Sequence, residues 1–264
     1  MAFARVNGVV LHYRDEGRQD APAIVFSNSL GTDLRIWDAV AAALGTEYRI
    51  LRYDKRGHGL SEAPQPPYAI ADHVADLRAL LDHVGIDALV MVGLSVGGMI
   101  AQGLASAEPD RVRAVVLCDT APKIGTAEMW NARIAAIEEK GLGGIAESVL
   151  ERWFTPPYRR SDNSDYTGYT AMLTRTPEQG YVGTIMGIRD ADLTEATRAL
   201  TQPVLCIVGD QDGSTPPDLV RAMAELIGAP LEVIRDAGHI PCVEQPEATT
   251  ALIRSFAERH LGGR

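Results

Sequence analysis

The sequence predicts an α/β fold in which a mostly parallel central sheet is flanked by helices and carries a helical insertion. Short apolar runs rich in β-branched residues recur along the chain, as expected for strands buried on both faces. Amphipathic stretches separate most of these runs, and this alternation favours parallel strands joined by helices. The alternation fails between about residues 121 and 199, where helical patterns follow one another. We therefore expect one core from residues 1–120 and 200–264, and a helical unit from residues 121–199 inserted into it.

Each expected element has a local signal. Asn7-Gly8 predicts a tight hairpin turn between Phe3–Val6 and Val9–Tyr13, because both residues tolerate the positive φ of such turns. Apolar residues at helical spacing predict helices after Asp72 and after Pro216-Pro217. The buried strands are expected at Ala23–Ser27, Tyr48–Tyr53, Ala88–Gly93, Val112–Asp119, Val204–Gly209 and Leu231–Ile234. The helices of the insertion are expected near Met129–Ile137, Ile145–Trp153, Asp165–Arg175 and Glu178–Arg189.

Composition and charge narrow the class of protein. The 264 residues are 46% hydrophobic and 23% charged, which suits a folded domain with a full core rather than a disordered or fibrous chain. Lys and Arg number 25 against 35 Asp and Glu, a formal charge of −10, so nucleic acid and anionic membranes are not expected as partners. A small molecule is the expected partner, and the sequence leaves open whether copies of the chain associate.

The cysteines and the N-terminal segment favour a cytoplasmic protein. Cys118, Cys206 and Cys242 cannot form a complete disulfide set and match no zinc-binding spacing, which suits a reducing compartment. The first residues lack the basic and apolar regions of a signal peptide. The uncharged span Ala88–Ala107 is diluted by glycines and polar residues, so we expect a buried strand, turn and helix there rather than a membrane span.

Gly93-Leu94-Ser95-Val96-Gly97 fits the G-x-S-x-G pattern, in which a nucleophilic serine occupies a strained turn between a strand and a helix. Glycines are needed because larger side chains would collide at this turn. The expected strand Ala88–Val92 and the expected helix Val96–Ala107, ended by Pro109, supply the required context. Ser95 is therefore the candidate nucleophile, and the alternative is a glycine-rich packing turn with a passive serine.

A serine nucleophile needs a base that is itself oriented by a carboxylate. In chains with this turn the partners follow in the order serine, acid, histidine. His239 fits that order, in a loop after the last expected strand. His58 is the main rival, but it precedes Ser95 in a glycine-rich loop that we interpret as a structural turn with paired charges.

Two aspartates compete for the role of the acid. Asp210 and Asp212 both follow the strand that ends at Gly209, at the edge where α/β sheets form their sites. Asp212 is favoured because it lies further out on the loop, and Asp210 is then its helper. In the alternative interpretation both aspartates cap the following helix.

The oxyanion formed during acyl transfer needs two N–H donors, one from the residue after the nucleophile and one from the loop after an earlier strand. Val96 provides the first. Ser27–Gly31 follows an expected strand, so the Leu30 N–H is the candidate for the second. The alternative for this segment is a simple turn.

Together these residues resemble the α/β-hydrolase superfamily along nearly the whole chain. The resemblance is carried by the G-x-S-x-G turn, Asp54-x-Arg56-Gly57-x-Gly59-x-Ser61, Gly209-x-x-Asp212 and Gly238-His239. Within the superfamily the chain is most similar to the 3-oxoadipate enol-lactonases, which act in the β-ketoadipate pathway of aromatic compound degradation. This narrower similarity is carried by Ser27–Asp33, Leu51–Asp54, Gly93–Met99, and Ile124-Gly125 ahead of Trp130 and Arg133.

The resemblance implies a helical cap over the site and a carboxylic ester hydrolase that needs neither a metal nor an organic cofactor. Its substrate would be a small cyclic enol ester with a carboxylate, opened by Ser95 with His239 as base and released by water as 3-oxoadipate. One alternative is a broader carboxylesterase, lactonase or cofactor-free perhydrolase with the same catalytic residues. Another, from a different class, is a ligand-sensing α/β-hydrolase with slow hydrolysis or none.

Arg133 is the candidate for binding the substrate carboxylate. It shares a helical face with Trp130 and Ile137 in the insertion, and a guanidinium can hold a carboxylate through two hydrogen bonds. The alternatives are that Arg133 pairs with a glutamate of the insertion or is solvated. Trp130 and Trp153 are further candidates for substrate contact, with burial in the core as their alternative.

Overall fold

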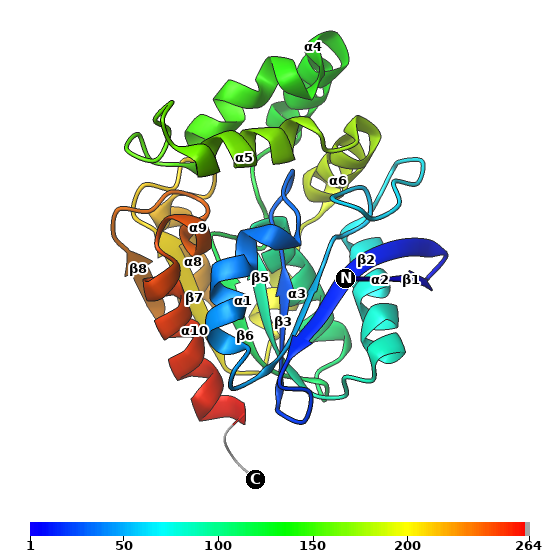
Figure 1. Cartoon of the computed structure of the whole chain (residues 1–264), viewed down its shortest axis with the longest axis vertical. Helices are drawn as coiled ribbons and strands as arrows, with labels where there is room; N and C mark the ends of the chain where they lie inside the picture. The colour runs from blue at the N-terminus through cyan, green and yellow to red at the C-terminus, as the bar shows by residue number, and fades with distance from the viewer. Residues whose placement is uncertain (262–264) are drawn as a thin grey trace.

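The computed structural model describes residues 1–261 and contains one eight-stranded sheet in the order β1-β2-β4-β3-β5-β6-β7-β8 (Figure 1). The strands pair antiparallel from β1 to β2 and from β2 to β4, and parallel from β4 to β8. This confirms the predicted fold class. The strands are β1 (Ala2–Val6), β2 (Val9–Gly17), β3 (Ala23–Ser27), β4 (Arg49–Tyr53), β5 (Leu89–Leu94), β6 (Val112–Cys118), β7 (Val204–Gly209) and β8 (Leu231–Ile234).

Helices cover both faces of the sheet, which explains why its strands read as continuous apolar runs. In β3, for example, Ile24 and Phe26 belong to one hydrophobic cluster and Val25 to the other, and all three are fully buried. The first cluster includes side chains of α1 and α10, and the second includes those of α2, α3 and α8. The covering elements are η1 (Leu34–Trp37), α1 (Asp38–Leu44), α2 (Ile70–Val84), α3 (Val96–Ala107), α8 (Pro217–Ile227), α9 (Pro241–Glu244) and α10 (Pro246–Leu261).

The local signals predicted most elements to within one or two residues. The turn Asn7-Gly8 joins β1 to β2, with φ of 46° at Asn7 and 78° at Gly8, as a two-residue hairpin turn requires. Helix α3 begins and ends at the expected residues. The uncharged span around it forms β5, a turn and α3, and no helix among the described residues is long and apolar enough to cross a membrane.

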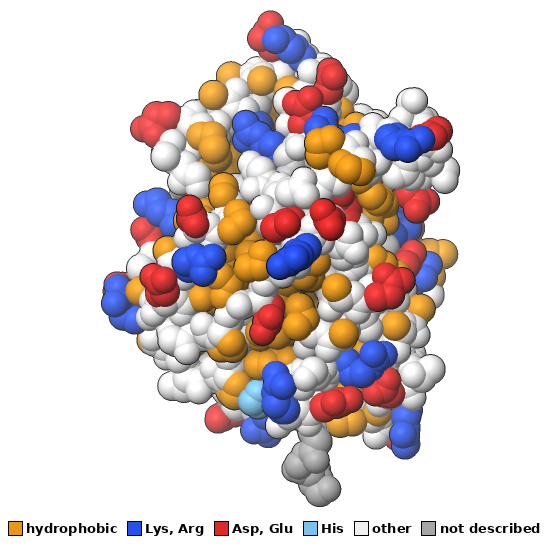
Figure 2. Space-filling view, turned by 90° about the vertical axis from the view of Figure 1, so that its left-hand side faces the viewer, with side chains coloured by type: hydrophobic (Ala, Val, Ile, Leu, Met, Phe, Trp, Pro, Cys, Tyr) orange, Lys and Arg blue, Asp and Glu red, His pale blue; other side chains and the backbone are white. Residues whose placement is uncertain are grey.

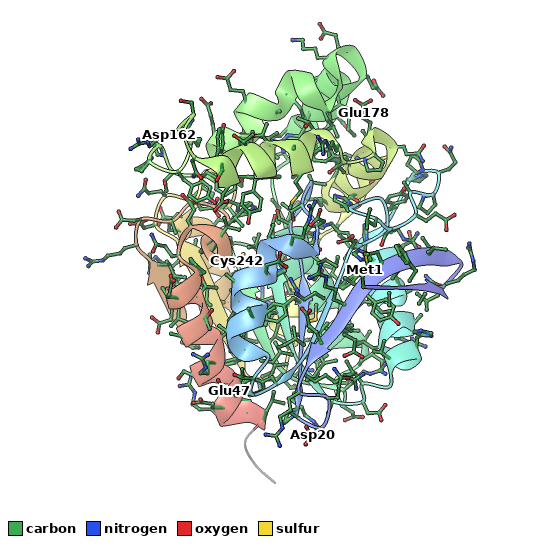
Figure 3. The ribbon with its side chains drawn as sticks, viewed as in Figure 1. Met1, Asp20, Glu47, Asp162, Glu178 and Cys242 are labelled. Carbon is green, nitrogen blue, oxygen red and sulfur yellow. The ribbon has the colours of Figure 1, made fainter. Side chains whose placement is uncertain are left out.

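Four helical segments lie between β6 and β7: α4 (Ala127–Trp153), α5 (Ser164–Thr174), α6 (Glu178–Asp190) and α7 (Thr194–Arg198). The first three, α4 to α6, occupy the upper part of the view in Figure 1. The fourth, α7, packs against α3 and α8 of the core. The segment labelled α4 consists of two helices, as expected from the sequence, because the backbone leaves the helical conformation at Gly141, where φ is 68° and ψ is 172°. The Leu142 N–H after Gly141 donates to the carboxylate of Glu178 at 3.0 Å, at the start of α6 (Figure 3).

The insertion contacts the core at a pair of glycines. A Cβ built on Gly57, in the loop after β4, would lie 2.5 Å from the Cα of Gly180 in α6. A Cβ on Gly180 would lie 2.2 Å from the carbonyl oxygen of Gly57. Real Cβ atoms do not approach other atoms this closely, so α6 can contact this loop only because neither residue has a side chain.

The surface carries charges of both signs. On the face shown in Figure 2, Lys and Arg side chains lie among Asp and Glu side chains, with apolar side chains between them. Many surface charges of the described chain are paired, such as Arg254 with Glu47 at 3.1 Å. The described part of this face has no continuous basic patch, in keeping with the acidic total of −10.

Candidate active site

Ser95 lies on a strained turn between β5 and α3. Its φ is 59° and its ψ is −120°, a conformation that non-glycine residues rarely adopt. A Cβ on Gly93 would lie 2.2 Å from the carbonyl oxygen of Gly97, and a Cβ on Gly97 would lie 2.2 Å from that of Ser27. The two glycines therefore allow the turn to close against itself and against the loop after β3.

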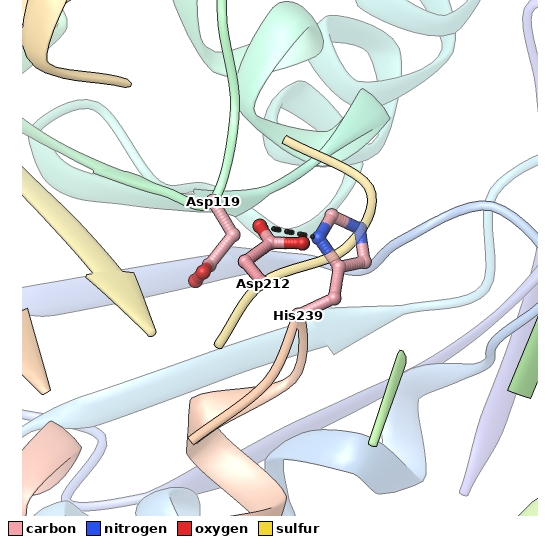
Figure 4. A group of neighbouring side chains, drawn as sticks. All are labelled: Asp119, Asp212 and His239. Carbon is pink, nitrogen blue, oxygen red and sulfur yellow. Dashed lines mark hydrogen bonds and ion pairs between the residues drawn. The ribbon is translucent and has the colours of Figure 1, made fainter. Parts of the chain in front are cut away.

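His239 is oriented by Asp212. Its Nδ1 lies 2.9 Å from Asp212 Oδ2, and both side chains are buried (Figure 4). Burial acts to raise the pKa of Asp212, but His239 and the hydrogen bonds from Thr215 and the Ser214 N–H outweigh it and hold that pKa below its ordinary value. Asp210 instead accepts a hydrogen bond from the Ala237 N–H at 3.3 Å. Of the two aspartates predicted from sequence, Asp212 is thus the one that contacts the histidine.

The other ring nitrogen of His239 faces the loop after β3. Its Nε2 lies 3.4 Å from the hydroxyl of Ser29, a residue that sequence reasoning did not single out. Ser95 and His239 line the same pocket, but the described residues include no hydrogen bond between them. Such catalytic hydrogen bonds are often long without substrate and tighten when it binds, so the arrangement is compatible with a nucleophile and its base.

The two predicted oxyanion donors are both available. Val96 is the first residue of α3, where an N–H has no partner within the helix, and the Leu30 N–H donates to no acceptor in the described part of the chain. The next amide, Gly31 N–H, donates to His58 Nε2 at 2.9 Å. His58 is buried, and burial together with Lys55 lowers its pKa well below the ordinary value, so it acts as a neutral acceptor within this loop.

Two arginines line the pocket above Ser95, and neither has an ion-pair partner among residues 1–261. The Arg133 guanidinium lies over the Trp130 ring, 5.2 Å from its centroid, and Arg152 lies beside Trp153 in the sequence of α4. The buried hydroxyl of Tyr181 also lines the pocket, and within the described chain it has no hydrogen-bond partner. The three residues predicted to contact substrate, Arg133, Trp130 and Trp153, therefore share one pocket with Ser95 and His239.

Asp119 follows β6 and adds a second carboxyl to the site (Figure 4). Its Oδ1 accepts from the Gly209 N–H at 2.9 Å, and its buried Oδ2 has no partner among the described residues. Burial, and then the charge of Asp212, raise the pKa of Asp119 well above its ordinary value. Ligand atoms of Asp119, Asp212 and His239 lie within 4.8 Å of one another. Asp212 already accepts from Ser214, Thr215 and His239, so the arrangement suits proton transfer better than cation binding.

A serine on a strand-to-helix turn, a histidine and aspartate from later loops, and two free amides define the α/β hydrolases. The chain belongs to this family, since residues 22–246 match the family described as alpha/beta hydrolase fold.

Within this family the chain is similar to enol-lactonases and to an esterase. 3-Oxoadipate enol-lactonase 2 of Acinetobacter baylyi is 36% identical to this chain, over 95% of this chain and 94% of that protein. The crystal structure of the enol-lactonase from Burkholderia xenovorans has a TM-score of 0.93 and 38% identity, covering 97% of this chain and 99% of that one. A thermophilic esterase from Thermogutta terrifontis, solved with malate bound, has a TM-score of 0.90 and 28% identity, covering 98% of both chains.

Proposed function

We propose that this hydrolase opens a small anionic enol-lactone of the 3-oxoadipate type by serine nucleophilic catalysis. Its membership of the family and its enol-lactonase relatives make it a hydrolase of esters and lactones. One observation carries the finer proposal: Ser95 and His239 share a small aromatic pocket with Arg133 and Arg152, which have no ion-pair partners in the described chain. A neutral ester would leave both cations unused, whereas an anionic lactone would be held by them.

In the proposed first step Ser95 Oγ attacks the lactone carbonyl while His239 Nε2 accepts the serine proton. Asp212 stabilises the resulting imidazolium through its contact with Nδ1. The carbonyl oxygen becomes an oxyanion between the N–H groups of Leu30 and Val96. Ring opening breaks the acyl C–O bond and forms an acyl-enzyme ester.

The leaving group of a lactone stays attached to the acyl chain, so nothing departs after the first step. The released enolate takes up the proton that His239 accepted from Ser95 and becomes a ketone, which cannot close the ring again as an enolate would. This transfer leaves His239 neutral for the second step. Water, deprotonated by His239, then attacks the acyl-enzyme ester, and Ser95 is regenerated. The product has two carboxylates, one of them newly formed beside the oxyanion donors.

We further propose that residues 121–199 act as a cap that forms the substrate end of the pocket. Arg133, Arg152, Trp130, Trp153 and Tyr181 all come from α4 and α6 of this segment. Ser95 and His239 come from the core, so substrate would be held between the two parts. The proposal includes a cytoplasmic location, in keeping with three cysteines that are all buried and unpaired.

The test is hydrolysis of the enol-lactone by the purified chain, followed spectroscopically as the enol-lactone is consumed. We expect turnover in the wild type and its loss in Ser95→Ala, with Ser106→Ala as a matched control on the exposed part of α3. Turnover at the wild-type rate in Ser95→Ala would refute the nucleophile. A much faster reaction with a neutral aryl ester than with the lactone would instead indicate a broad carboxylesterase on the same residues.

A further inference from the structure

Lys55 is a fully buried lysine behind the loop that holds the proposed oxyanion donor. It follows β4, and its Nζ donates to the carbonyl oxygen of Ser29 at 2.6 Å and to that of Asn28 at 3.2 Å. A buried ammonium is costly unless it is hydrogen-bonded, and these two carbonyls belong to the loop after β3. The sequence places Lys55 in a loop without apparent chemistry, and the mechanism above does not use it.

The Ser29 carbonyl and the Leu30 N–H belong to the same peptide group. In a trans peptide the C=O and the following N–H point in opposite directions. Because Lys55 holds the Ser29 oxygen on one side, the Leu30 N–H is directed to the other side, and Leu30 lines the pocket with Ser95. The hydroxyl and N–H of Thr32 donate to the same oxygen at 2.9 and 3.3 Å, which further fixes this peptide.

We propose that Lys55 is a positioning residue for the oxyanion hole. Its ammonium binds the Ser29 carbonyl and thereby orients and polarises the Leu30 N–H. This inference rests on the proposed function, because it assigns Leu30 as a donor to the oxyanion. A cation on the carbonyl of a peptide draws electrons from its N–H, and hydrogen bonds in such a chain strengthen one another. The effect grows as negative charge develops on the substrate oxygen, so it acts on the transition state more than on bound substrate.

The surroundings of Lys55 make this device sensitive to pH. Burial lowers the pKa of Lys55 to about 7, against the opposing influence of Asp54 and Asp33. The other titratable groups that face it, His58 and His73, are buried with pKa values well below ordinary, so both are neutral near pH 7. The Lys55 ammonium is therefore the form that is lost as pH rises through about 7, and the polarisation of the Leu30 amide is lost with it.

The experiment compares Lys55→Met with the wild type and with Lys140→Met, which removes an exposed lysine of α4. We expect Lys55→Met to lower kcat by about tenfold or more with KM changed less than about twofold, because removal of a whole oxyanion donor costs about 100- to 1,000-fold. The component of the kcat profile that falls as pH rises through the Lys55 pKa should disappear in Lys55→Met and persist in Lys140→Met. An unchanged kcat and pH profile in Lys55→Met would overturn the proposal.

A second measurement needs no variant and covers the case in which Lys55→Met does not fold. The chain has only three lysines, so the side-chain nitrogen of Lys55 can be followed by NMR. A boronic acid that adds to Ser95 creates a negatively charged tetrahedral adduct, and by thermodynamic linkage it should raise the pKa of Lys55 by about one unit. Formation of the adduct without a change in that pKa would refute the coupling. Failure of the wild type to hydrolyse any ester or lactone would refute the proposed function instead.

Discussion

Replacing Arg133 by Met should weaken catalysis on anionic lactones and spare neutral ones. Arg133 is partly buried, lies over Trp130 and has no ion-pair partner among residues 1–261, so a ligand carboxylate would be its first anionic partner. A hydrogen bond to a charged group contributes about 1.5–3 kcal/mol, which corresponds to about 10- to 150-fold in kcat/KM. Arg152 is exposed, where water competes for the guanidinium, and the loss in Arg152→Met should lie at or below the lower end of that range.

The assay measures kcat/KM of both variants on the enol-lactone and on its methyl ester, which keeps the ring and removes the charge. Arg198→Met is the matched control, since Arg198 is an exposed arginine of the insertion that pairs with Glu195. We expect the loss in Arg133→Met to appear with the anion, to shrink at high salt and to be nearly absent with the methyl ester. Equal losses on the two substrates would refute recognition of a carboxylate and indicate a packing role.

Three further predictions concern the catalytic core. Asp212→Asn should lower kcat by about 10,000-fold with the fold retained by circular dichroism, because the amide favours the wrong tautomer of the histidine. The pKa of Asp119 is raised, so the folded chain keeps a proton that the unfolded chain releases above pH 3.8. The contribution of Asp119 to stability therefore falls as pH rises. Asp119→Asn should raise Tm at about pH 8, and this gain in Tm should disappear towards pH 4. Gly97→Ala should lower Tm and kcat together, because the added Cβ would lie 2.2 Å from the Ser27 carbonyl oxygen. Gly143→Ala in α4 is the control: its Cβ would have no atom within 4 Å, so activity should be unchanged. A tolerated Gly97→Ala, or an Asp119→Asn variant less stable at every pH, would contradict these readings.

The sequence predicted the elements whose signals are local. A strand buried on both faces must be apolar at every position, and the turn at Ser95 must have glycine where the loop after β3 approaches it, so these features were visible in the residues themselves. The order of serine, acid and histidine pointed to His239. Both Asp210 and Asp212 remained candidates in the sequence, because their distances to His239 depend on the path of a loop.

Residues brought together only by packing were missed. Arg152 and Tyr181 line the pocket because of how α4 and α6 lie on the core. Asp119 could have been found, since it follows a buried strand at the same edge of the sheet as Asp212. For Lys55 the sequence offered no signal, because its partners are backbone carbonyls and any residue would supply those.

The contact between Gly57 and Gly180 limits how this protein can be recombined with its relatives. The two positions belong to different segments of the chain, yet each has room only for a hydrogen atom because of the other. An insertion transplanted from a relative would dock in the same way only if it carried glycine at position 180 and met glycine at position 57. Alanine at either position would push α6 away from the loop after β4. A chimaera without glycine at both positions would therefore have a pocket of different shape, although every residue that lines the pocket would be unchanged.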